Sequence, residues 1–135
     1  MVVAGTITGL VLGSIIGAVA TMAGSYFLFW RRRQAARSHL RRAFETELAA
    51  LSYIDGMAER GEYETLTQTV EKPVVYESNA DDIGHLSGAE VEALVAFYTD
   101  LYWLRDQQDI EDKKDRVHDI VEKRQRAVTA IRDHE

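Results

Sequence analysis

The chain has no cysteine, only one proline, and no charged residue between Val2 and Trp30. The absence of cysteine excludes disulfides and thioester-linked lipid anchors, and it fits a reducing compartment. About a hundred residues remain once the uncharged segment is set aside. That length is too short for a Rossmann unit or a barrel, although a small catalytic domain would still fit.

The uncharged segment spans 29 residues and is followed at once by three arginines. As a helix it would be roughly 43 Å long, whereas the hydrocarbon core of a bilayer is about 30 Å thick. An aromatic cluster that includes Phe27 and Trp30 precedes the arginines, and such rings favour the headgroup level. We expect residues 1–30 to form a transmembrane anchor, embedded from about Ile7 to Phe27.

The basic residues after the segment predict its orientation. Six arginines and no acidic residue lie within 31–42, namely Arg31, Arg32, Arg33, Arg37, Arg41 and Arg42. The positive-inside rule therefore predicts a single-pass protein of the cell membrane, with its N-terminus outside and its C-terminal domain cytoplasmic. A cleaved signal peptide with a site near Ala18–Ala20 is the alternative. It is less favoured because signal peptides carry their positive charge before the apolar region.

Glycines recur every fourth residue in the anchor, at Gly5, Gly9, Gly13 and Gly17. This spacing gives three overlapping GxxxG units on one helix face. Side-chain-free positions let two helices approach closely, so the stripe predicts packing against a second copy or another membrane protein. The alternative is that glycine is simply common in membrane helices.

Charge is uneven along the rest of the chain. The balance is +3 in 31–60, −8 in 61–100 and −1 in 101–135. An anionic bilayer would attract the first segment and repel the second. The arginines then either bind the membrane surface or only set the topology, and both interpretations stay open. Nucleic acid is not an expected partner, because the chain is acidic overall.

Residues 31–60 carry apolar side chains at helical spacing, which predicts a basic juxtamembrane amphipathic helix. The apolar positions are Leu40, Phe44, Leu48, Leu51, Ile54 and Ala58. No proline or glycine lies between Phe27 and Asp55, so the helix is expected to run on from the anchor and to end at Gly56 or Gly61. Residues 61–87, rich in β-branched side chains, predict a loop with at most a short extended piece, then a short turn capped by Asn79.

Residues 88–135 have two helical patterns separated by a charged stretch. Ser87 and Glu90 match a capping box, which predicts a long helix that starts at Gly88. The second pattern includes Val117, Ile120 and Ile131. The chain either bends between them to give a helical hairpin or small bundle, or it continues as one long helix that pairs with another chain as a coiled coil. The predicted fold class is all-α, one transmembrane helix followed by a small cytosolic helical unit.

No catalytic or metal-binding motif is present. The four histidines are scattered, and neither HExxH nor a Walker loop nor GxSxG occurs. The nearest set of oxygen ligands is Glu77, Asn79, Asp81, Asp82 and His85, which capping and turn formation explain without a metal. His118 is expected to pair with Asp115 or Glu122 at the surface. We therefore expect no enzyme, no metal, no cofactor and no small-molecule substrate.

Three short segments, 75–79 (VYESN), 83–86 (IGHL) and 95–98 (VAFY), form a motif. It resembles a pattern in short single-pass membrane proteins of bacteria and archaea. The resemblance implies an N-terminal anchor, a basic helix, this motif and one further helix, and it implies no catalytic or binding residue. The chain has 12 arginines and 4 lysines with an acidic surplus, which is typical of salt-adapted archaea.

The favoured function is that of a non-enzymatic membrane protein that oligomerises through its glycine face and presents a cytosolic helical interaction domain. The bilayer and a second copy, or another membrane protein, are the expected partners. The alternative is a pore-forming or transport-accessory subunit in which several anchors surround a conduit. The lack of an ionisable residue in the anchor counts against an ion path.

Overall fold

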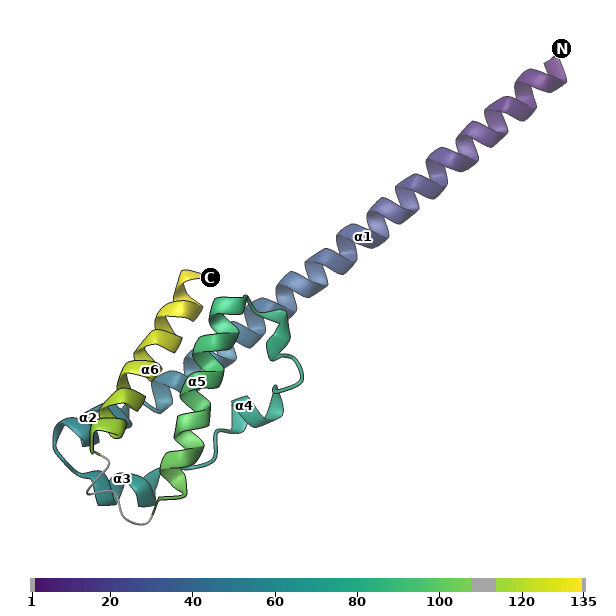
Figure 1. Cartoon of the computed structure of the whole chain (residues 1–135). Coiled ribbons are helices and arrows are strands. Elements are labelled where there is room, and N and C mark those ends of the chain that lie inside the picture. Colours follow the sequence, from purple (N-terminus) through teal and green to yellow (C-terminus); the bar gives the residue numbers. More distant parts are fainter. Residues whose placement is uncertain (1, 108–113, 135) are drawn as a thin grey trace. The chain divides into compact units, whose positions relative to one another are not determined.

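A computed structural model describes residues 2–107 and 114–134, with side chains from residue 11 onward. Within these ranges every regular element is a helix, and no strand occurs. The all-α fold class is therefore confirmed. The chain divides into two compact units, 1–36 and 37–135. The first helix, α1 (Val2–Ala50), contributes to both, and each unit is described by itself (Figure 1).

The first unit is helical and has no core of its own. Every side chain from 11 to 36 is exposed. Near the N-terminus, α1 is long and apolar enough to cross a membrane. The described part of the predicted apolar segment, residues 11–30, is therefore a helix whose side chains are exposed on every face.

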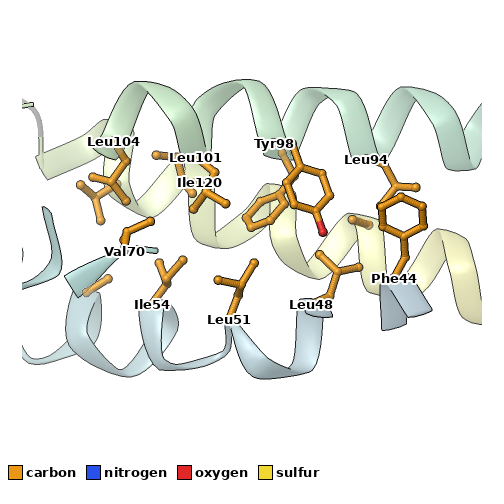
Figure 2. Close-up of a cluster of buried hydrophobic side chains, with 14 of the residues drawn as sticks. Phe44, Leu48, Leu51, Ile54, Val70, Leu94, Tyr98, Leu101, Leu104 and Ile120 are labelled. Carbon is orange, nitrogen blue, oxygen red and sulfur yellow. The ribbon is translucent and has the colours of Figure 1, made fainter. Parts of the chain in front are cut away.

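The second unit is a helical bundle built on the last turns of α1. Leu40, Phe44 and Leu48 lie four residues apart on one face of α1 and are buried. Two long helices, α5 (Gly88–Arg105) and α6 (Lys114–Asp133), run antiparallel and side by side (Figure 1). Side chains from α1, α5 and α6 meet in the core, shown in Figure 2. The unit therefore buries its apolar stripes within one chain.

The helix expected over 31–60 is interrupted at Leu51 and Ser52. α1 ends at Ala50, and α2 (Tyr53–Glu59) follows after the break. Arg124 of α6 reaches this point and donates from Nη1 to the carbonyl of Leu48, over 3.0 Å. It also forms a two-pronged ion pair with Asp55 of α2, at 2.7 and 2.8 Å. The break is thus held by Arg124, which lies 76 positions from Leu48 and 69 from Asp55 in sequence, and no local pattern predicts this contact.

α2 ends just before Gly61, which is one of the two residues predicted to end the helix over 31–60. Its φ of +73° lies in the left-handed region that favours glycine. The backbone N–H of Gly61 donates to the carbonyl of Ala58 over 3.2 Å, and that of Glu62 donates to the carbonyl of Met57 over 2.9 Å. These two bonds form a Schellman motif, which satisfies the last carbonyls of α2.

Residues 61–87 contain helices where the sequence favoured a loop with an extended piece. The structure has α3 (Tyr63–Thr69), α4 (Val74–Ser78) and a 3-10 turn, η1 (Ile83–His85). Burial of Leu66 and Val70 draws α3 into the core. The hydroxyl of Thr69 donates back to the carbonyl of Thr65, over 2.6 Å, so threonine is accommodated in the helix. Tertiary burial has overridden the local β-branched preference.

Asn79 does not cap a following helix, and that prediction is wrong. It ends α4, where its side-chain amide donates to the carbonyl of Val75 over 2.8 Å. The prediction for Ser87 is confirmed, because α5 begins at Gly88 behind a complete capping box. α5 ends at Arg105 and α6 begins at Lys114. Residues 108–113, including Ile110 in the charged stretch, lie outside the described residues.

Candidate functional site

The apolar surface of α1 is the first candidate site. Eleven large apolar side chains between residues 11 and 30 are 49–72% exposed. They are Val11, Leu12, Ile15, Ile16, Val19, Met22, Tyr26, Phe27, Leu28, Phe29 and Trp30. Such a continuous apolar surface marks an interaction with a membrane or with another protein.

The predicted glycine face lies on this segment. A side chain added at Gly13 or Gly17 would meet no atom of this chain within 4 Å, so both positions are open to a neighbouring helix. Thr21, four residues further on, donates its hydroxyl to the carbonyl of Gly17 over 2.9 Å. The hydroxyl group of Thr21 thus has a hydrogen-bond partner within the helix and does not require water as its acceptor. Gly5 and Gly9 belong to α1, but their surroundings lie outside the described residues.

The six arginines predicted at the membrane surface do not share one environment. Arg31, Arg32, Arg33 and Arg42 are exposed, and Arg37 is partly buried. The guanidinium of Arg31 lies 5.9 Å from the ring centroid of Phe27. Arg37 has a buried Nε atom without a hydrogen-bond partner in the described part of the chain. These differences separate the exposed arginines from those that belong to the fold.

Arg41 serves the bundle and is not a free surface charge. Its guanidinium contacts the carboxylate of Glu90 at 2.9 and 3.0 Å, and the Glu90 side chain is fully buried. Glu90 also accepts the backbone N–H of Ser87 at 3.2 Å. Burial by itself would raise the pKa of Glu90. The hydrogen bonds from Arg41 and Ser87 outweigh it, so the pKa is lowered and Glu90 stays charged.

Glu47 of α1 is the centre of a second polar cluster, which the sequence did not single out. Its carboxylate accepts the backbone N–H groups of Val75 and Tyr76, at 2.6 and 3.2 Å. These N–H groups lie in the first turn of α4, where no partner within the helix is available. The hydroxyl of Tyr98 donates to the same carboxylate over 2.5 Å. Glu47 therefore caps α4 from a different helix and ties it to α5.

Aromatic rings surround this carboxylate. Tyr76 stacks on Tyr98 with a centroid distance of 4.2 Å and an interplanar angle of 15°. Phe44 packs against both rings at centroid distances of 6.5 and 6.1 Å. Tyr102, one turn beyond Tyr98, donates its hydroxyl to Glu77 of α4 over 2.7 Å. Two of the three phenols, Tyr98 and Tyr102, therefore have hydroxyls that are held by carboxylates.

The tyrosine hydroxyls are shifted toward their neutral form. Burial, and then the hydrogen bond to Glu47, raises the pKa of Tyr98 far above its ordinary value of 10.0. Burial, followed by the hydrogen bond to Glu77, raises the pKa of Tyr102 to about 12. A phenol with a raised pKa is a poor general base near neutral pH. These groups are therefore suited to holding the fold together and not to proton transfer.

Asp100 of α5, which is buried like Glu90, faces α6. Lys123 lies 2.5 Å from it and Arg116 lies 3.7 Å from it. Hydrogen bonds to Asp100 and Asp119 raise the pKa of Lys123 and keep it charged. Arg116 also lies over the ring of Trp103, 3.7 Å from its centroid. This network fixes the register of α5 against α6.

Four of the residues considered for metal binding have partners within the chain. Glu77 accepts from Tyr102 and Asn79 donates to Val75, while His85 lies 3.9 Å from Asp82. The described residues contain no cluster of three or more histidine and acidic side chains able to hold a metal.

His118 does not form the predicted pair with Asp115 or Glu122. Its Nε2 atom lies 2.9 Å from the hydroxyl of Tyr63 in α3. An open groove of about 450 Å³ lies on the bundle, lined by α6 and the α1–α2 junction. Its lining is mainly polar and includes Glu45, Arg124 and Arg132.

No protein-family model, no curated protein and no solved structure matches the chain. The function is therefore argued from the geometry alone. The two features that stand apart from the folded bundle are the uncovered apolar helix and the exposed arginines that follow it.

Replacing Glu47 by glutamine tests its role as the cap of α4. The amide keeps one acceptor oxygen but turns an NH₂ group toward the backbone N–H groups of α4. We expect a loss of about 2 kcal/mol in the free energy of unfolding. The measurement is urea unfolding of the detergent-solubilised protein, followed by Trp103 fluorescence in a Trp30→Phe background.

The matched control is Glu45→Gln, two positions away on the same helix. Glu45 is a partly exposed group that lies 3.6 Å from the exposed Arg132. It should change stability by less than about 0.5 kcal/mol. Equal effects of the two substitutions would contradict the capping role.

The tyrosine hydroxyls predict an alkaline limit to stability. The pKa of each is raised on folding, so their contribution is fully present below pH 10.0, the ordinary tyrosine value, and is lost as the pH rises through the folded pKa. Phenolate absorbance should show Tyr102 titrating at about 12. In Glu77→Gln this pKa should fall toward 10.0, while an unchanged value would show that Glu77 does not act on Tyr102.

Proposed function

We propose that the chain is a non-enzymatic, single-pass membrane protein. The apolar part of α1 anchors it, a glycine face of the anchor associates with a second copy, and the bundle of 37–135 serves as a cytoplasmic interaction domain. The N-terminus lies outside the cell membrane. The observation that carries the proposal is the uncovered apolar surface of residues 11–30.

The size of this surface supports a bilayer as its solvent. Full burial of a large apolar side chain contributes about 1.5–3 kcal/mol. Eleven such side chains, each about half exposed or more, therefore represent on the order of 10 kcal/mol. That amount is similar to the entire unfolding free energy of a small domain. Water is thus an unfavourable surrounding for this helix, whereas hydrocarbon is a favourable one.

Close approach of a second helix is supported by the open positions on the glycine face. Gly24 lies seven residues after Gly17, which places it only about 20° away around the helix. A side chain added at Gly24 would also meet no atom within 4 Å. The small-residue face therefore continues to the cytoplasmic end of the anchor. Packing there would gain dispersion contacts that lipid alone cannot supply.

An interaction role for the bundle is supported by how its buried and partly buried carboxylates are used. The carboxylates of Glu47, Glu90 and Asp100 are each engaged by hydrogen bonds or ion pairs from this chain's own residues. They hold helices together. A rigid domain that presents its surface to a partner fits this arrangement better than an acid-base catalyst.

The double substitution Gly13→Leu/Gly17→Leu tests the glycine face. Two leucines in the contact should hold the backbones apart and weaken self-association at least about tenfold, which corresponds to about 1.4 kcal/mol. The readout is cross-linked dimer or higher oligomer in membranes, followed by mass measurement of the intact complex in detergent.

The matched control is Ser14→Leu/Ala18→Leu. These residues have the same spacing but lie about 100° further around the helix. The control should associate like the unaltered protein. Unchanged oligomerisation in the glycine variant would overturn the glycine-face proposal and leave the anchor proposal intact.

A further inference from the structure

We propose that Arg31, Arg32 and Arg33 form a binding site for the phosphate groups of anionic phospholipids. This proposal rests on the proposed membrane anchor, and it specifies the class of lipid that the anchor selects. The three residues belong to the first unit of the structure and follow Trp30 directly. The other arginines of the basic segment are not required for the site.

The three guanidinium groups cover a broad arc of the helix. Successive residues of an α-helix are about 100° apart, so three in a row span about 200° of its circumference. All three side chains are exposed. A ring of headgroups around the helix can therefore be contacted from most directions. Guanidinium groups suit this task because their planar fork matches two phosphate oxygens at once.

The charge of this cluster is not balanced within its own unit. Residues 1–36 contain no acidic residue, so no carboxylate of that unit can pair with Arg31, Arg32 or Arg33. The nearest acidic residue in sequence is Glu45. By contrast, most arginines of the bundle are paired with a carboxylate, namely Arg41, Arg60, Arg116, Arg124, Arg126 and Arg132. An anion from outside the chain can therefore serve as the partner of the cluster.

Aromatic residues fix the depth at which the arginines would lie. Trp30 is 49% exposed and precedes Arg31, and the ring of Phe27 lies beneath the Arg31 guanidinium. Tryptophan favours the boundary between hydrocarbon and headgroups. The guanidinium groups that follow it then lie at the level of the phosphates. Depth, charge and geometry therefore agree on a lipid headgroup as the occupant.

The rest of the chain opposes attraction to an acidic membrane. Since the whole chain carries −6, it carries −9 outside these three arginines. An anionic surface repels such a domain over roughly a Debye length, about 8–10 Å at ordinary salt. A preference for anionic lipid must therefore arise from short-range contact at the cluster. This separates the proposal from a general attraction of a basic protein.

Trp30 is a reporter placed at the site itself. The protein, with Trp103→Phe as background, is reconstituted into vesicles of phosphatidylcholine or phosphatidylglycerol whose acyl chains are brominated near the headgroup end. Bromine quenches tryptophan fluorescence on contact. Mixtures of brominated and plain lipids then give the relative association of the two headgroups beside Trp30.

The expected result is a preference of about fivefold for phosphatidylglycerol, the size of one arginine–headgroup contact. Replacing Arg31, Arg32 and Arg33 together by glutamine should bring the ratio to about one. Raising the salt to 1 M should reduce the preference, because the Debye length shrinks to about 3 Å. The control Lys114→Gln/Arg126→Gln/Arg132→Gln removes the same charge from exposed positions of α6 and should keep the preference.

Three outcomes would overturn the site in different ways. Equal quenching by both lipids, unaffected by the arginine substitutions, would leave the anchor in the bilayer and refute the headgroup site. Absence of quenching by either lipid would place Trp30 outside the membrane and refute the anchor as well. Loss of the preference in the α6 control would assign it to overall charge and not to the cluster.

Discussion

Burial of apolar surface is the constraint on which the rest of the structure depends, and α1 meets it in two ways along a single helix. From Leu40 onward its apolar side chains are buried against α5 and α6. Between residues 11 and 30 the same kind of side chain is exposed. In the proposal, the bilayer is the apolar surrounding of residues 11–30, as the bundle core is the apolar surrounding of the side chains from Leu40 onward. The six positions from Leu40 to Ala58 that the sequence assigns to one face are all buried, although the helix breaks among them.

Charged groups decide how the helices of the bundle are arranged, because apolar contacts alone have little directionality. Glu47 holds α4 and α5 to α1, Arg41 holds the start of α5, and Arg124 holds the junction of α1 and α2. Each is an intramolecular pair between segments far apart in sequence. Removing one member of a buried pair leaves the other without compensation, which makes such pairs sensitive points of the fold. The exposed arginines at 31–33 belong to a unit that contains no acidic residue, and that contrast underlies their proposed place at the membrane surface.

Local signals were sufficient for some elements and not for others. The capping box at Ser87 and Glu90 predicted the start of α5, and the apolar segment predicted a long N-terminal helix, because both depend on nearby residues. Asn79 was misassigned because the same side chain can cap either end of a short helix. α3 was missed because burial of Leu66 outweighs the preferences of its threonines. The roles of Glu47 and Arg41 required knowledge of α4 and α5, which no spacing in the sequence provides.

The most direct test of the proposed anchor is the topology of the chain in intact cells. The chain has no native cysteine, so an introduced cysteine is its only thiol. Single cysteines are introduced as Val3→Cys and Ser78→Cys, the second at an exposed position of α4. Both are treated with a maleimide that does not cross membranes. The account predicts that Val3→Cys is labelled in intact cells and that Ser78→Cys is labelled only after lysis, with both variants in the membrane fraction. Labelling of Ser78→Cys in intact cells, or recovery of the protein in the soluble fraction, would contradict it.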